Sequence, residues 1–185
     1  MVKKEIRVIG IDDAPFDKFN DSKVLVVGVV MRGGSWVDGI LSTKVAVDGD
    51  DSTKKIIAMI NKCKFKPQLQ CIFLDGIAVG GFNVIDVKEL SKKTSLPIIV
   101  VIRRMPDIST IKKTLIKIKK QQKIKLIEKA GNVIKIDDIF VQLTGIDLEQ
   151  ARKILKIVCT RSLIPEPLRL AHLIAQGIIF GESKG

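Results

Sequence analysis

Aspartate residues stand directly after several apolar segments of this 185-residue chain. They are Asp12 and Asp13 after EIRVIGI, Asp48, Asp50 and Asp51 after TKVAV, and Asp75 after QCIFL. If these segments are neighbouring strands, the carboxylates converge and repel one another, unless a cation neutralises them or some of them bind protons. Oxygen ligands of this kind suit Mg²⁺ or Mn²⁺. Two such ions about 4 Å apart can activate a water molecule and stabilise the leaving oxygen of a phosphodiester.

A structural role competes with the metal-ligand role, because Asp-Gly is a common tight-turn pair. Asp38-Gly39 is predicted to form a hairpin turn. Asp48 and Asp51 stay open, because either could bind a metal ion and one could instead cap the helix that begins at residue 52. For Asp12 and Asp75 we favour the metal-ligand role, since both follow apolar strands in a chain with few acidic residues.

The elements that must position these aspartates are predicted from apolar periodicity. Strands are expected at residues 5–11, 23–31, 36–47, 70–74 and 97–102, shorter strands at 124–127, 132–136 and 139–143, and helices at 52–62, 107–120, 148–158 and 168–179. Three consecutive strands followed by alternating helices and strands indicate an α/β fold with a mixed sheet, where ligands collect beyond the carboxyl ends of strands. Because no linker or repeat interrupts the pattern, residues 1–185 are expected to form one domain.

The charge balance indicates a polyanionic partner. The chain holds 32 Lys and Arg residues against 20 Asp and Glu residues, for a formal net charge of +12. A charge of this size attracts nucleic acids over long range. A lysine-rich thermophile surface is the alternative, but such surfaces usually balance lysine with glutamate. DNA, or RNA, is therefore the expected partner.

A soluble, cytoplasmic protein without a membrane anchor is expected. The sequence has no basic leader followed by an apolar run, and no apolar stretch approaches the length of about 18 residues that a membrane span needs. Cys63, Cys71 and Cys159 have unrelated spacings, so neither a disulfide framework nor a zinc site is predicted, and all three are expected to be reduced.

Three segments resemble motifs of endonuclease V, in the same order along the chain. GID (10–12) resembles that family's first metal-binding motif, and LDG (74–76) resembles the end of its central strand. RSLIPEPLRLAH (161–172) is similar to its closing segment, including the histidine near the metal site. The first two motifs are short, whereas the third is specific.

The resemblance to endonuclease dU, a smaller archaeal family, is closer and covers nearly the whole chain. The segments that carry it are GIDDAPF (10–16), RGGSWVDG (32–39), VDGDDST (47–53), LDGIAVGGFNVID (74–86) and PEPLRLAH (165–172). This resemblance implies a ribonuclease H-like fold, with a mixed sheet of five or slightly more strands flanked by helices. It also implies a DNA-repair enzyme that uses metal ions to cleave DNA at a deaminated base, deoxyuridine in particular.

The site residues that the resemblance implies are partly ambiguous. Endonuclease V has a glutamate after its third strand, where this chain has VDGDDST. The second acidic ligand would then be Asp51 or Asp48, and the spacing does not distinguish between them. The hypothesis is a Mg²⁺- or Mn²⁺-dependent endonuclease in which these residues, Asp12 and Asp75 hold the metal ions. His172 would act near them through water or as a proton shuttle, or would be an ordinary structural histidine on an apolar helix.

Further candidate contacts to nucleic acid are small, aromatic or cationic. They are Trp36, Gly80, Gly81, Arg103, Arg104, Arg169 and the lysines of residues 112–120. Trp36 could fill the gap left by an extruded base, or pack on the rim of the sheet. The two glycines could admit a phosphate closely, or form a plain loop. The lysine-rich helix is ordinarily a solvated face, which could add sequence-independent affinity.

Two other classes of function compete with the nuclease hypothesis. A phospho-acceptor receiver domain also places paired acids after its first strand, but it needs a lysine where Arg103 and Arg104 stand and has no use for PEPLRLAH. A nucleic-acid-binding protein of the same fold without catalysis is the other class. Its salt-dependent binding would survive the loss of every acidic candidate.

Overall fold

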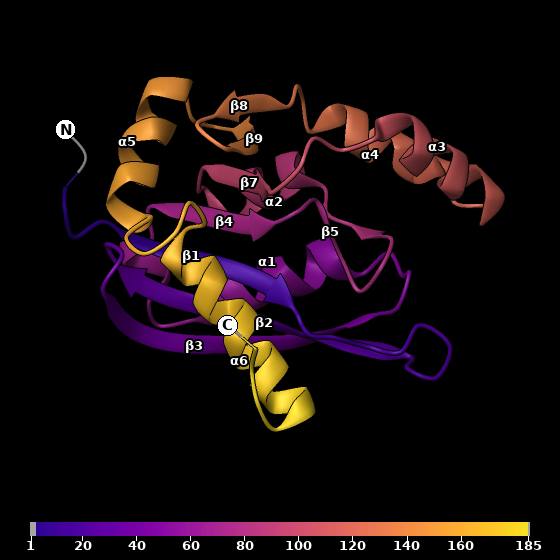
Figure 1. The fold of residues 1–185 in the computed structure, drawn as a ribbon, viewed down its shortest axis with the longest axis horizontal. Coiled ribbons are helices and arrows are strands. Elements are labelled where there is room, and N and C mark those ends of the chain that lie inside the picture. Colours follow the sequence, from indigo (N-terminus) through magenta and orange to yellow (C-terminus); the bar gives the residue numbers. More distant parts are fainter. Residues whose placement is uncertain (1–2, 185) are drawn as a thin grey trace.

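A mixed β-sheet forms the centre of the protein in the computed structural model, which describes residues 3–184 (Figure 1). Its seven strands within those residues, in spatial order, are β3 (Trp36–Ala46), β2 (Lys23–Arg32), β1 (Arg7–Asp13), β4 (Cys71–Asp75), β7 (Ile98–Ile102), β9 (Ile139–Thr144) and β8 (Ile134–Ile136). The central strands β1, β4 and β7 are parallel, and every other pair in the sheet is antiparallel. A small hairpin, β5 (Ala78–Val79) and β6 (Asn83–Val84), follows β4.

Helices cover both faces of this sheet, and two more lie beyond the carboxyl ends of its parallel strands, against the β5-β6 hairpin (Figure 1). They are α1 (Ser52–Lys62) and α2 (Val87–Thr94) on one face, α5 (Leu148–Val158) and α6 (Glu166–Phe180) on the other, and α3 (Ile108–Lys117) and α4 (Ile124–Lys129) beyond the strand ends, with short 3₁₀ turns at Lys66–Gln68 and Gln121–Lys123. Within residues 3–184, no helix combines the length and the apolar character needed to cross a membrane.

Alternation along β1 decides which face each side chain meets. Ile9 and Ile11 pack in the cluster that contains residues of α1 and α2, whereas Val8 packs in the cluster beneath α5. Asp12 therefore shares the α5 and α6 face with Val8, and Asp13 turns toward the opposite face. These adjacent carboxylates therefore have different partners, because Asp12 meets His172 of α6 and Asp13 meets the backbone of Gly80.

Two sequence-based predictions of local structure are wrong. Residues 124–127 form part of helix α4 rather than a strand, because Ile124 and Ile127 lie three positions apart and pack together against Leu115 of α3. Asp38-Gly39 makes no hairpin turn. It lies inside β3 at a register shift opposite Val30 and Met31, and the hairpin turn falls earlier, between β2 and β3.

The sequence-based prediction also lacks helix α2. Its N-terminal signal is present, because the side chain of Asp86 accepts a hydrogen bond from the backbone N–H of Glu89 at 2.9 Å. The helix is only eight residues long, and Val87, Leu90 and Thr94 are its buried positions. So short an apolar stripe gives a weak periodic signal.

Candidate active site

Asp12 and Asp75 lie at the carboxyl ends of two neighbouring parallel strands. The register pairs Ile11 of β1 with Leu74 of β4, so one further step places the two aspartates side by side. Adjacent strands lie about 4.8 Å apart. Asp75 shares a face with Phe73, which packs in the same cluster as Val8, so both carboxylates point toward the α5 and α6 face. The structure thus brings together the two aspartates that the sequence favoured most.

Helix α6 brings His172 to this pair, and Gly10 makes the approach close. A Cβ at position 10 would lie 2.5 Å from the backbone nitrogen of Leu168 and would also overlap the backbone of Pro167. Only a residue without a side chain lets the first turn of α6 rest on β1 in this way. The GID and PEPLRLAH motifs are therefore in direct contact. One turn later along α6, His172 Nδ1 lies 2.8 Å from Asp12 Oδ2.

The hydrogen bonds around His172 fix the orientation of its ring. The backbone N–H of Lys184 donates to Gln176 Oε1 at 3.2 Å, which directs Gln176 Nε2 toward the histidine, 2.9 Å from its Nε2. Because the amide NH₂ donates, Nε2 of His172 accepts and Nδ1–H donates to Asp12. His172 therefore orients the carboxylate of Asp12 rather than packing as an isolated apolar-face histidine.

Asp12 is held in conditions that oppose its ionisation. Burial, followed by the negative charges of Asp75 and Asp13, raises the pKa of Asp12 from 3.8 to about 7, although the contact with His172 acts in the opposite direction. Its side chain is only 8% exposed. A cation placed between Asp12 and Asp75 would relieve this repulsion, so the electrostatics of the site favour a bound positive charge.

Asp13 and Arg103 complete the site. Asp13 Oδ2 accepts a hydrogen bond from the backbone N–H of Gly80 at 2.8 Å, and burial raises the pKa of Asp13. Arg103, just after β7, places its Nη2 3.0 Å from Asp75 Oδ2. The residues lining one open hollow of about 520 Å³ are Asp12, Asp13, Ala14, Pro15, Phe16, Asp75, Arg103 and His172. The sequence placed Asp13 in the acidic cluster but gave it no role in the site.

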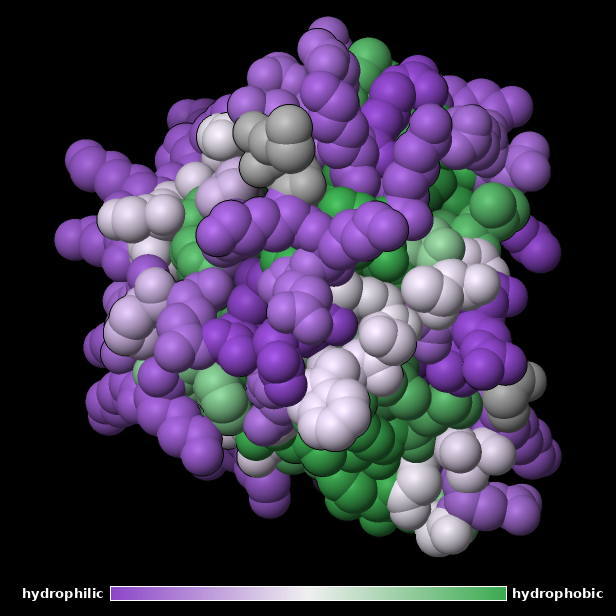
Figure 2. All heavy atoms as spheres, turned by 90° about the vertical axis from the view of Figure 1, so that its left-hand side faces the viewer, coloured by the Kyte–Doolittle hydropathy of each residue, from purple (hydrophilic) through white to green (hydrophobic). Residues whose placement is uncertain are grey.

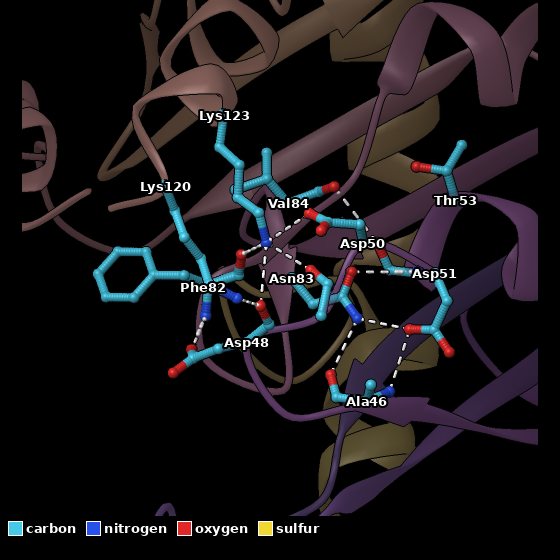
Figure 3. Close-up of polar contacts among 12 residues, drawn as sticks. Ala46, Asp48, Asp50, Asp51, Thr53, Phe82, Asn83, Val84, Lys120 and Lys123 are labelled. Atoms are coloured by element: carbon cyan, nitrogen blue, oxygen red, sulfur yellow. Dashed lines mark hydrogen bonds and ion pairs between the residues drawn. The ribbon is translucent and has the colours of Figure 1, made fainter. Parts of the chain in front are cut away.

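Asp48 and Asp51 are not among the residues that line this hollow, and that one of them is the second acidic ligand stays a prediction. Figure 3 shows the contacts that both carboxylates make instead. Asp51 Oδ1 accepts hydrogen bonds from Ala46 N at 3.0 Å and Asn83 Nδ2 at 2.7 Å. Burial alone would raise the pKa of Asp51, but these bonds outweigh it and hold the pKa below its ordinary value. Asp51 occupies the N-cap position of α1, yet its carboxylate does not cap the helix.

Asp48 instead organises a neighbouring turn. Its Oδ1 accepts from the backbone N–H of Phe82 at 2.7 Å, and its own N–H donates to Gly80 O at 2.8 Å. Its φ of 51° lies in the left-handed region, which aspartate tolerates better than most residues. A Cβ at Gly81 would collide with the Asp48 carboxylate. The turn at Gly80 and Gly81 is thus hydrogen-bonded to both aspartates, because Gly80 O accepts from Asp48 N and Gly80 N donates to Asp13 Oδ2.

Lys123 braces this turn from the side of the α3 and α4 arm (Figure 3). Its side chain is 2% exposed. Its Nζ donates to Phe82 O at 2.6 Å, to Asp48 O at 3.1 Å and to Gly49 O, and lies 2.9 Å from Asp50 Oδ1. Lys120 also donates to Asp48 O. Sequence reasoning missed Lys123 because a lysine in a lysine-rich segment carries no mark of burial.

The remaining predicted contact residues are dispersed. Arg169 is paired with Glu166, with Nη2 to Oε2 at 2.8 Å, and does not line the hollow. Arg104 is exposed beside Arg103. Trp36 begins β3 opposite Arg32, which pairs with Arg7 at the start of β1. It therefore lies at the far end of the sheet from Asp12, so the structure does not bring Trp36 to the acidic hollow.

The donors at the hollow suit a hard cation. Within residues 3–184, no group of three or more His, Cys, Asp and Glu side chains is arranged to hold a metal ion by itself. Mg²⁺ does not need such a cage, because it commonly takes one or two carboxylates, several waters and phosphate oxygens of the substrate. Asp12 and Asp75 supply two carboxylates of this kind, and burial, followed by the charge of Asp75, raises the pKa of Asp12.

Comparison with protein families identifies the group to which these features belong. A model of the family described as endonuclease dU matches residues 4–179. The chain belongs to the endonuclease dU family. A relative, the UPF0215 protein of Methanothermobacter thermautotrophicus, is 48% identical over 189 residues, covering 100% of this chain and 93% of that protein.

Solved structures show how the endonuclease dU fold relates to others. A protein of unknown function from Archaeoglobus fulgidus matches with a TM-score of 0.88 and 40% identity, over 94% of this chain and 98% of that one. Endonuclease V from Bacillus subtilis matches with a TM-score of 0.60 and 14% identity, over 90% and 77%. Endonuclease V from Ciona intestinalis, in complex with an inosine-containing DNA, gives 0.55 and 22%, over 89% and 82%. These likenesses confirm the predicted ribonuclease H-like fold.

Proposed function

We propose that this protein is a metal-dependent endonuclease that cleaves DNA at or near deoxyuridine and acts in DNA repair. The observation that carries the proposal is the pair of carboxylates, Asp12 and Asp75, that end adjacent parallel strands and open into one hollow. Membership of the endonuclease dU family supports both the reaction and the lesion. The net charge of +12 supports a polyanionic substrate.

Asp12 and Asp75 would hold Mg²⁺ or Mn²⁺, with Asp13 as the next carboxylate in the hollow. The metal ions would supply an activated water nucleophile and charge stabilisation at the leaving oxygen. His172 keeps Asp12 in the orientation needed for binding, because its Nδ1–H donates to Asp12 while its Nε2 accepts from Gln176. Arg103 is half exposed beside Asp75. Its guanidinium can leave Asp75 and bind a phosphate of the substrate instead.

The surroundings of the hollow suit a nucleic-acid backbone. The exposed Arg104 and the lysines of α3 would add salt-dependent, sequence-independent affinity. The turn at Gly80 and Gly81 lies next to Asp13 and would let a phosphate or a flipped nucleotide approach the backbone. Arg169, held by Glu166, would contact the backbone only by leaving that ion pair.

The test is a cleavage assay on labelled oligonucleotides that contain deoxyuridine, deoxyinosine, inosine or no lesion, with Mg²⁺, Mn²⁺ or EDTA. We expect cleavage of the deoxyuridine DNA with either metal and none in EDTA. Asp12→Asn and Asp75→Asn should each reduce the rate roughly 1000-fold or more, since each removes a carboxylate that stabilises the metal ions. Asp138→Asn, an exposed change in the turn before β9, is the matched control and should cleave normally.

The same cleavage assay tests whether Asp51 is the second acidic ligand of the metal ions. Asp51→Asn retains the oxygen that accepts from Ala46 and Asn83, so we expect cleavage within about tenfold of the original rate. A loss as large as that of Asp75→Asn would instead make Asp51 a ligand. Normal turnover by the Asp12 or Asp75 variant would overturn the proposed mechanism. Binding of the oligonucleotides without cleavage in either metal would leave the non-catalytic binding protein as the function.

A further inference from the structure

A second hollow, larger than the acidic one, lies at the opposite end of the sheet. It has a volume of about 720 Å³ and lies between the turn that joins β2 to β3 and the C-terminal end of α5. Lys4, Arg32, Trp36, Lys156 and Thr160 are among the residues that line it. β1 runs from Arg7, opposite Arg32, to Asp13, so the hollow and the carboxylates are about 20 Å apart along the strand.

The turn at this hollow is fixed by close backbone packing. A Cβ at Gly33 would lie 2.8 Å from Lys4 O, and its φ of 55° is in the left-handed region. A Cβ at Gly34 would lie 2.5 Å from the side chain of Thr160 and 2.9 Å from Ile157 O. The two glycines therefore let the turn rest directly on the N-terminal segment and on the end of α5. The part of the hollow formed by this turn is therefore held in place by close packing against the backbone.

Trp36 presents an open aromatic surface at the rim. The residue is 62% exposed, and the guanidinium of Arg32 lies 5.5 Å from its ring centroid. Asp38, whose side chain is 10% exposed, holds Arg32 Nε at 3.0 Å and Arg7 Nε at 2.6 Å. This arrangement fixes Arg32 beside the indole. Arg7, Arg32 and Asp38 together keep one positive charge. Asp38-Gly39 thus supports the tryptophan surface instead of forming a turn.

Charge at the hollow is positive. Lys4 and Lys156 add to the cation left at Arg32, and Glu5 is the acidic residue in the lining. The end of the molecule that carries the hollow faces the viewer in Figure 2, where hydrophilic side chains cover the upper and left parts and a hydrophobic patch lies below them. An exposed aromatic ring beside fixed cations is the combination that binds unpaired bases and their phosphates. A duplex hides the faces of its bases and could not stack on the ring in the same way.

We propose that this hollow binds single-stranded nucleic acid, with an unpaired base stacked on Trp36 and its phosphates held by Lys4 and Lys156. The site is separate from the carboxylates, so its occupation does not require catalysis. When the protein is bound to DNA, the hollow would engage an unpaired strand about 20 Å from the acidic residues. It would thereby favour substrates that combine duplex with single-stranded DNA.

Trp36 gives this site its own spectroscopic reporter, because the chain has one tryptophan and no tyrosine. The experiment titrates the full protein with a short oligothymidylate in EDTA and follows tryptophan fluorescence. We expect saturable quenching that weakens as salt is raised. Lys4→Ala/Lys156→Ala should weaken binding roughly tenfold, whereas Lys54→Ala/Lys62→Ala on α1, with the same loss of charge, should change it by less than about twofold.

Further measurements separate this site from the acidic hollow. Asp12→Asn should quench as the original protein does, so failure of the nuclease proposal would leave this result intact. Trp36→Ala, followed by anisotropy of a labelled oligonucleotide, should bind roughly tenfold more weakly, and Trp36→Phe should recover most of the affinity. Absence of quenching, equal effects of the two lysine pairs, or equal quenching by a blunt duplex would each overturn the proposal. Quenching by an acidic peptide but not by oligothymidylate would reassign the hollow to a protein partner.

Discussion

Replacement of Asp12 by asparagine should make the metal-free protein more stable at alkaline pH. Asp12 is buried beside Asp75 and Asp13, which raises its pKa from 3.8 to about 7. The asparagine side chain would keep an oxygen that can accept from His172 Nδ1 while removing the charge. The substitution therefore tests the electrostatic cost of the carboxylate separately from its shape.

The sign and size follow from the two pKa values. Between pH 3.8 and about 7 the folded protein holds a proton on Asp12 that the unfolded chain has released, so stability falls as pH rises through this window. From pH 5 to pH 8 the shift acts over about two pH units, which corresponds to roughly 3 kcal/mol at 1.36 kcal/mol per unit. Asp12→Asn lacks this contribution.

The assay is urea denaturation of both proteins in EDTA at pH 5 and at pH 8. Other titrating groups, including Asp13, are present in both proteins, so the difference between their pH dependences isolates Asp12. We expect the original protein to lose about 3 kcal/mol more than Asp12→Asn over this range. Addition of Mg²⁺ at pH 8 should stabilise the original protein but have little effect on the variant. Identical pH dependence in the two proteins would refute the reasoning.

Two structural contacts give further predictions. Gly10→Ala should destabilise the protein by about 3 kcal/mol and reduce cleavage, because a Cβ would press on the first turn of α6 and displace His172. A thermal melt and the cleavage assay measure these two effects. An unchanged melting temperature would contradict the prediction. Lys123→Met should cost about 3 kcal/mol by leaving the buried carbonyls around Phe82 without a donor, whereas Lys125→Met, an exposed neighbour, should cost less than about 0.5 kcal/mol in urea denaturation.

Some features of the site follow from local sequence. A run of apolar residues followed by an aspartate predicts a buried strand with a carboxylate at its end. The positions of Asp12 and Asp75 at strand ends could therefore be predicted from the apolar runs alone. Asp107 at the start of the lysine-rich helix is another example, because its side chain accepts from Thr110 N at 3.0 Å. Such signals depend on neighbours within a few residues, which the sequence displays directly.

Other features depend on which strands become neighbours. Asp48 and Asp51 follow an apolar strand just as Asp75 does, yet β2 lies between β3 and β1, so their strand ends two places away from Asp12. Their carboxylates then meet Phe82, Ala46 and Asn83 instead of a second carboxylate. No local pattern reveals that separation.

The sequence by itself determined the strand-end aspartates, the α/β character and the positive charge of the protein, because these depend on residue type and short-range periodicity. Only the tertiary structure decided that Asp12 meets Asp75 and His172, that Asp48 accepts from Phe82 and Asp51 from Ala46 and Asn83, and that Trp36 belongs to a different surface. The physical reason is that strand order and register set which side chains share a face and an edge. These are long-range choices, made by packing across the whole sheet.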